Sequence, residues 1–134
     1  MATFNKFNAF AENVVEVINL GTDQFVVALT NTAPTASNSV LADITQITYT
    51  NLSSRNLTTS SSSQTSGTYT LALADLTLTA TGAVGPFRYV VIYDDTPTSP
   101  ADPLVGWYDY GSSISLASGE TFTIDFGASV ISLS

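Results

Sequence analysis

The chain of 134 residues carries 11 acidic residues against three cations, which gives a net charge of −8, and it contains neither Cys nor His. Hydrophobic residues make up 44% of it and charged residues only 10%, a balance typical of one folded domain. Three cations are too few to neutralise the phosphates of a nucleic acid or to bind an anionic membrane surface. Because Cys and His are absent, disulfides, thiolate metal sites and histidine-based catalysis are excluded.

The N-terminal segment has helical periodicity. Apolar residues recur every three to four positions from Phe4 to Ile18, which predicts one amphipathic helix over residues 3–18. Thr3 can serve as its N-cap, and Gly21 lies at the expected stop. The apolar stripe packs either on the domain's own sheet or on a neighbouring subunit. We expect no secretion signal and no transmembrane helix, because no basic segment precedes an apolar run and no such run reaches about 18 residues.

Two contrasting segments follow the helix. Residues 23–31 (DQFVVALTN) are apolar at successive positions, which predicts a central strand covered on both faces. Residues 51–67 (NLSSRNLTTSSSSQTSG) are a Ser/Thr-rich stretch without periodicity. A long loop that is mobile or ordered by a partner fits this composition, and a regular strand through residues 55–59 is the alternative.

The rest of the chain has strand patterns. Residues 68–81 alternate in polarity, with a change of phase at Asp75 that predicts a bend or bulge. Further strands are predicted at residues 87–93, 104–110, 121–126 and 130–133, and the first two form a hairpin around a Pro-rich loop. The prediction is one mainly β domain over residues 1–134, an antiparallel β-sandwich or barrel-like fold with one N-terminal α-helix and strands between about residues 23 and 133.

Carboxylates are the only side chains left for chemistry. Asp94, Asp95, Asp102 and Asp109 cluster around the Pro-rich loop. Such residues cap turns, bind a cation such as Ca²⁺, or work as a hydrolytic pair, but their spacing matches no known calcium loop. We predict that the protein is not an enzyme and assign no catalytic, cofactor-binding or metal-binding residue. Whether Asp94, Asp95 and Asp102 bind a cation stays open.

Aromatic residues concentrate in the second half of the chain. Trp107, Tyr108 and Tyr110, with Tyr89 and Tyr93, would either form core and subunit contacts or stack on a sugar. Strand alternation favours the first interpretation, because it places Trp107 and Tyr108 on opposite faces.

Two blocks of the chain carry a resemblance to a known family. FNKFNAFAENVVEVINLGTDQFVVALTNTAPT with ADITQIT, and GPFRYVVIYDDTPTSPADPLVGWYDYGSSISLASGETFTIDF, resemble small virion proteins of tailed double-stranded DNA bacteriophages. Residues 51–67 depart from the pattern of this group, which is Gly-rich there. The resemblance implies a structural component of the phage particle that works without catalysis.

Within that group a capsid decoration (cement) protein is expected. It would bind the major capsid protein and copies of itself, with a trimer favoured, at the outer capsid surface after assembly in the host cytoplasm. A tail, neck or head–tail connector protein is the alternative, and a glycan-binding virion module for host attachment is the second alternative. The residues predicted to contact a partner are Phe4, Phe7, Phe10, Arg55, Trp107 and Tyr108.

Overall fold

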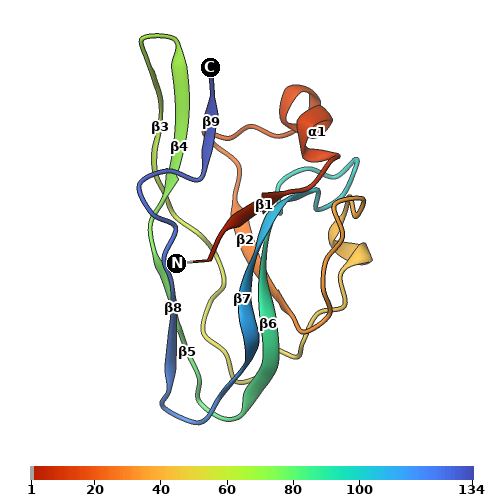
Figure 1. Cartoon of the computed structure of the whole chain (residues 1–134), viewed down its shortest axis with the longest axis vertical. Coiled ribbons are helices and arrows are strands. Elements are labelled where there is room, and N and C mark those ends of the chain that lie inside the picture. The colour runs from red at the N-terminus through yellow and green to blue at the C-terminus, as the bar shows by residue number, and fades with distance from the viewer. Residues whose placement is uncertain (1) are drawn as a thin grey trace.

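Two layers of antiparallel strands face each other in the computed structural model, which describes residues 2–134 (Figure 1). The predicted mainly β sandwich is therefore confirmed. One layer is a four-stranded sheet in the order β1 (Phe4–Lys6), β7 (Leu104–Leu116), β6 (Val84–Asp94) and β2 (Phe25–Thr30). The other layer combines β3 (Thr59–Thr65), β4 (Thr68–Leu73) and β9 (Ile131–Leu133) with the pair β5 (Leu76–Thr79) and β8 (Thr121–Ile124).

The N-terminal helix is shorter than predicted. The helix α1 covers only Phe10–Glu16, and residues 4–6 form β1, which pairs with residues 106–108 of β7. The prediction of a helix over residues 3–18 with Thr3 as N-cap is therefore wrong. Phe4 packs on Tyr108 with ring centroids 5.4 Å apart, a contact that a helix starting at residue 3 would not make. Tertiary packing overrides the local helical periodicity here.

The strand β2 is covered as predicted, but it is not central. All six of its residues are buried, although it is the outermost strand of its sheet. Its outer edge is closed by residues 47–57: Val27 N–H donates to the Arg55 carbonyl at 3.0 Å. Leu57 N–H donates to the Phe25 carbonyl at 2.9 Å. A coil segment thus takes the place of a neighbouring strand.

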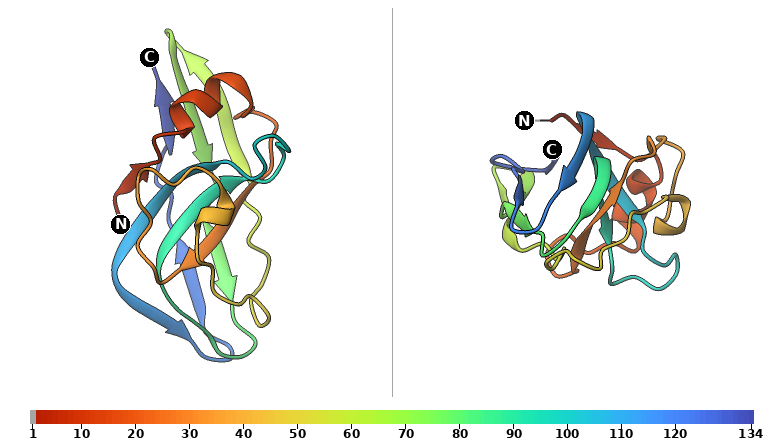
Figure 2. Two further views of the ribbon diagram at one scale, coloured as in Figure 1. Left: turned by 90° about the vertical axis from the view of Figure 1, so that its right-hand side faces the viewer. Right: turned by 90° about the horizontal axis from the view of Figure 1, so that it is seen from below.

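The hairpin of β6 and β7 is the longest pairing in the fold, and it confirms the predicted hairpin. Its strands run beyond the predicted bounds, to 11 and 13 residues, and the Pro-rich loop joins them. On one face of its sheet lies the main core, which includes Phe25, Phe87 and Ile124. On the other face a smaller cluster surrounds Phe7 and Ile44, beneath the N-terminal segment and the short 3₁₀ helix η1 (Leu41–Asp43) (Figure 2).

The Ser/Thr-rich segment is more ordered than predicted. Its second half is β3, which forms a hairpin with β4 that projects from the body (Figure 1). The predicted loop is therefore wrong from residue 59, and the alternative strand at residues 55–59 is misplaced. The bend expected at Asp75 is confirmed, because the chain leaves β4 there and begins β5, and the Asp75 carboxylate accepts a 3.0 Å hydrogen bond from Phe126 N–H. Across residues 2–134, no helix has the length and apolar character needed to cross a membrane.

Candidate functional site

Asp94 is the one fully buried carboxyl group of the described chain. Its Oδ1 accepts a 3.0 Å hydrogen bond from Thr96 N–H, but no donor within residues 2–134 reaches Oδ2. Burial, and then the adjacent carboxyl of Asp23, raise the pKa of Asp94 to about 8. The raised pKa favours the neutral, protonated form of this carboxyl group at neutral pH.

The other loop carboxylates also have local neighbours. Burial, and then Asp95, raise the pKa of Asp102. Within residues 2–134, no set of three or more acidic, His or Cys side chains is placed to hold a metal ion. The structure thus brings Asp94 to Asp23 and Asp95 to Asp102, and it does not join all of these groups into one cation site.

Asp109 lies in an ion pair. Arg88 Nε and Nη2 donate to its two carboxylate oxygens at 2.8 and 3.1 Å, and Gly111 N–H donates at 2.8 Å. The pairing with Arg88 holds the pKa of Asp109 below its usual range. Asp125 accepts a 2.8 Å hydrogen bond from Gly127 N–H, a local turn contact. Both carboxylates therefore have local hydrogen-bond partners.

The aromatic side chains pack on one another. Tyr108 is buried between Phe4 and Phe126, with ring centroids 5.4 and 6.0 Å away. Trp107 points to the opposite face of the sheet and packs on Phe7 at 4.6 Å. Tyr89 and Tyr93 are buried as well. The core interpretation is confirmed for Tyr89, Tyr93 and Tyr108, whereas Trp107 and Tyr110 are half-buried.

The residues predicted to contact a partner divide into two groups. Phe7, Phe10 and Tyr108 are at most 3% exposed, so their side chains pack inside this domain. Arg55 is half-buried and occupied internally: it lies 3.6 Å from the centroid of the Tyr49 ring and donates to the Val27 carbonyl at 2.6 Å. Phe4 and Trp107 remain half-exposed, on opposite faces of the sheet.

The second layer presents a surface that the sequence patterns did not lead us to predict. In β4, β5 and β8 the apolar residues point to the core and the alternate residues point away from it, whereas β3 (TSSSSQT) has no apolar residue. We call the solvent side the hydroxyl face; it consists of Ser61, Ser63, Thr65, Thr68, Thr70, Thr77, Thr79, Thr121, Thr123 and Ser132.

None of these ten residues is charged, but the exposed carboxylates of Asp75 and Asp125 lie beside them, at the junction of β4, β5 and β8. The hydroxyl face runs from the projecting hairpin to the β5–β8 pair, because β4 continues into β5 after the bend (Figure 1). Across that pair, the hydroxyls of Thr77 and Thr123 lie 2.9 Å apart and hydrogen bond to each other. The alternation in TYTLAL and TFTI was the signal that could have predicted this face.

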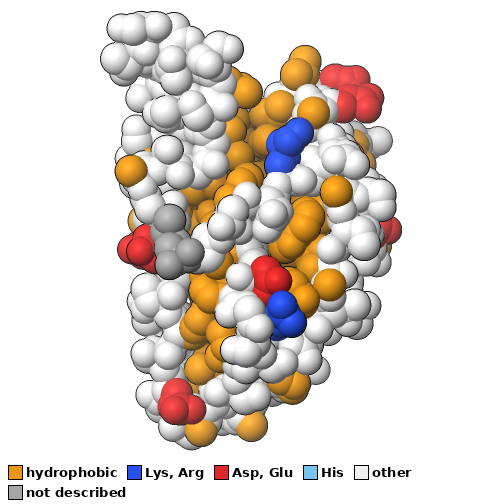
Figure 3. All heavy atoms as spheres, in the orientation of Figure 1, with side chains coloured by type: hydrophobic (Ala, Val, Ile, Leu, Met, Phe, Trp, Pro, Cys, Tyr) orange, Lys and Arg blue, Asp and Glu red, His pale blue; other side chains and the backbone are white. Residues whose placement is uncertain are grey.

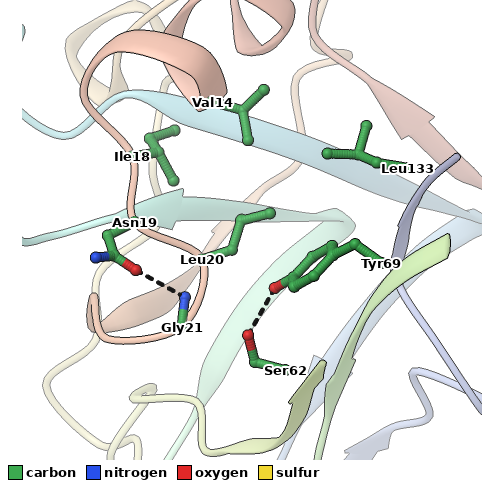
Figure 4. Close-up of a pocket in the computed structure, with 8 residues that line it drawn as sticks. All are labelled: Val14, Ile18, Asn19, Leu20, Gly21, Ser62, Tyr69 and Leu133. Atoms are coloured by element: carbon green, nitrogen blue, oxygen red, sulfur yellow. Dashed lines mark hydrogen bonds between the residues drawn. The ribbon is translucent and has the colours of Figure 1, made fainter. Parts of the chain in front are cut away.

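A hollow of about 440 Å³ lies on the inner side of the projecting hairpin. We call it the trough. Apolar side chains gather along this part of the surface in Figure 3. Figure 4 shows α1 and the following loop on one side of the trough and the β3–β4–β9 sheet on the other. All eight lining residues are uncharged: Val14, Ile18, Asn19, Leu20, Gly21, Ser62, Tyr69 and Leu133.

No family model, curated protein or solved structure matches this chain.

Proposed function

We propose that this protein is a structural, non-enzymatic component of a bacteriophage particle. Its role is that of a decoration (cement) protein, which binds the outer surface of the capsid shell and stabilises the head. The two sequence blocks that resemble small phage virion proteins support the virion assignment. The observation that carries the binding role is the hydroxyl face, a sheet surface whose ten strand residues are all uncharged Ser and Thr on a chain of net charge −8.

The energetics of such a face suit protein–protein contact. Burying a charged group costs several kcal/mol unless it is paired, whereas a hydroxyl that finds a partner contributes roughly 0.5–1.5 kcal/mol per hydrogen bond. The ten hydroxyl positions can therefore be covered at little cost, whereas Asp75 and Asp125 beside them need a partner or contact with solvent. Because the hydroxyls sit on strands, they are held in a regular array that a repeated partner surface can match.

The partners follow from this role. The major capsid protein supplies the repeated surface, and further copies of this chain occupy equivalent positions around it, with a trimer on a local symmetry axis favoured. Neither nucleic acid nor membrane is a partner in this proposal, because Lys6, Arg55 and Arg88 are the only cations and the last two are already engaged by Tyr49 and Asp109, respectively.

Copy number in purified particles, measured by mass spectrometry against the major coat protein, tests the assignment. A ratio near one per coat subunit is expected for a protein that covers the capsid. A few to a few dozen copies would instead place the chain in the tail, the neck or the head–tail connector, the alternative role. Absence from particles would overturn the virion assignment and favour the glycan-binding alternative, which a glycan array with and without EDTA would test.

A charge placed on the hydroxyl face tests the binding surface. Thr70→Arg and Thr123→Arg should weaken binding to particles that lack the protein by at least about 10-fold, because each buries an unpaired cation at the contact. Thr45→Arg is the matched control, since Thr45 is exposed on a loop away from this face. Wild-type binding by all three variants would exclude the hydroxyl face.

A further inference from the structure

We infer that the outer edge of β3 is a strand-addition site, at which an extended segment of the coat subunit pairs with the projecting hairpin. The inference deepens the proposed function and rests on it, because it names how the shell is held. The structural basis is a free, uncharged strand edge beside the trough.

The hairpin turn determines which backbone groups of β3 face outward. Ser66 and Gly67 both have positive φ, 51° and 84°, which makes a two-residue turn closed by the pair Thr65 and Thr68. In an antiparallel ladder every second pair exchanges its backbone hydrogen bonds. Counting from the turn, the backbone N–H and C=O groups of Thr65 and Ser63 point to β4. The backbone N–H and C=O groups of Ser62 and Gln64 point away from β4, to the outer edge.

The outward groups of β3 have no backbone partner elsewhere in residues 2–134. The edge of β2, by contrast, is closed by residues 47–57, and that of β5 by residues around Ser53, which exchanges hydrogen bonds with Thr79. With seven residues, β3 is the longest edge strand in the described part of the chain.

β3 lacks most of the features that prevent an edge strand from pairing with another strand. Natural edges carry Lys, Pro, inward charges, bulges or covering segments, because a bare edge pairs with any available strand. The sequence TSSSSQT has no charge and no Pro, and its one bulge lies at the start, between residues 59 and 61. The part nearest the tip is therefore open to an incoming strand.

The trough adds a place for one apolar side chain of that strand. Ser62 of β3 belongs to its lining, together with Leu20, Tyr69 and Leu133, the last of which is 50% exposed. Strand residues alternate between the two faces, so an added strand presents every second side chain to the inner side. The matching segment is uncharged and β-forming, with an aliphatic or aromatic residue aimed at the trough.

Buried area argues for a coat segment over a second copy of this chain. A stable dimer buries about 1,200–2,000 Å² in total, whereas two β3 edges of small hydroxyl side chains would bury far less than that. A segment of a shell subunit adds the trough contact and the hydroxyl face to the same interaction. The edge thus remains unpaired in the free protein and pairs on the particle.

Proline substitution at the outward positions tests the edge. Gln64→Pro and Ser62→Pro remove an outward N–H and obstruct an incoming strand, yet leave the hydrogen bonds to β4 in place. Each should retain the wild-type circular dichroism spectrum and lose at least about 10-fold in binding to purified particles that lack this protein. Gln64→Ala is the matched control, because the Gln64 side chain also accepts a hydrogen bond from Gly67 N–H at 3.1 Å.

Hydrogen exchange provides a measurement on the unmodified chain. In the free protein the Ser62 and Gln64 amides should exchange quickly, and on the particle they should slow at least about 10-fold, as resolved by mass spectrometry. Unchanged exchange on the bound particle would overturn strand addition, as would full binding by folded Gln64→Pro. Failure of the wild-type chain to bind any particle would instead overturn the proposed function. Concentration-dependent protection without particles would overturn the coat-segment assignment, because a second copy would then occupy the edge.

Discussion

The guanidinium of Arg55 lies over the ring of Tyr49, 3.6 Å from its centroid, and donates a hydrogen bond to the carbonyl of Val27. Tyr49 in turn accepts a 2.9 Å hydrogen bond from Leu29 N–H. One cation and one phenol therefore add side-chain hydrogen bonds to the backbone bonds by which residues 47–57 close the outer edge of β2. Arg55, predicted from the sequence as a partner contact, is a structural residue here.

Replacing Arg55 should destabilise the fold. Arg55→Ala removes the stacking contact and leaves the Val27 carbonyl without its partner, so the free energy of unfolding should fall by about 1–3 kcal/mol in urea titration. Arg55→Lys keeps the charge but loses the planar group, so its free energy of unfolding should lie between those of the wild type and Arg55→Ala. The exposed Lys6→Ala serves as the control, with a change within about 0.5 kcal/mol. An Arg55→Ala variant as stable as the wild type would contradict this role.

The buried Asp94 should make stability depend on pH. Its pKa in the folded chain, about 8, lies above the ordinary value of 3.8, so the native state binds more protons than the unfolded state between these values. The stabilisation that protonated Asp94 gives to the folded state is therefore complete below about pH 4 and is lost as pH rises towards 8. Asp94→Asn should remove this dependence and raise the free energy of unfolding at pH 8 by roughly 1–3 kcal/mol.

Urea titrations of the wild type and Asp94→Asn at pH 5 and pH 8 provide the measurement. The difference between the two proteins should be larger at pH 8. Asp95→Asn is the matched control, because Asp95 is exposed on the same loop. Parallel pH profiles for the wild type and Asp94→Asn would show that Asp94 is ionised throughout.

A side chain at Gly106 should displace β1. A Cβ there would overlap the ring of Phe4 and lie 2.7 Å from the Asn5 carbonyl oxygen, so Gly106→Ala should cost about 1–3 kcal/mol of stability, as overpacking does. Thermal unfolding measures it. Gly21→Ala is the comparison, since its Cβ would meet only small side-chain atoms, the Ser62 hydroxyl at 3.3 Å and Asn19 Oδ1 at 3.5 Å, and it should cost much less. Equal stability of the two variants would refute the assigned packing of β1 on β7.

Ser66 in the β3–β4 turn has an unfavourable backbone conformation that a substitution can relieve. Ser66 adopts φ of 51°, a conformation that Asn and Gly tolerate better than Ser does. Ser66→Asn should therefore stabilise the β3–β4 hairpin by about 0.5 kcal/mol and slow hydrogen exchange at the Thr65 and Ser63 amides, measured by NMR. Gly67→Ala, at φ of 84°, should have the opposite effect. Faster exchange in Ser66→Asn would argue against this turn geometry.

The sequence alone determined the fold class and the position of the longest hairpin. Alternation of polarity reports which face of a strand is buried, and this signal is local, so the strands around Phe87, Trp107 and Phe122 were predictable. The break at Asp75 was readable for the same reason, because a change of phase reverses the buried face. The lack of His and Cys likewise excludes imidazole and thiol chemistry by composition alone.

Tertiary structure alone decided the rest. The periodicity of residues 3–18 is helical, yet Phe4 belongs to a strand because Tyr108 of β7 supplies a partner that the local pattern cannot reveal. The Ser/Thr run has no periodicity, and only pairing with the apolar–polar alternation of β4 orders it. The hydroxyl face and the trough likewise join residues far apart in the chain, such as Thr77 with Thr123 and Val14 with Leu133. Local patterns specify which side of each strand is buried, but only long-range pairing determines which strands share a surface.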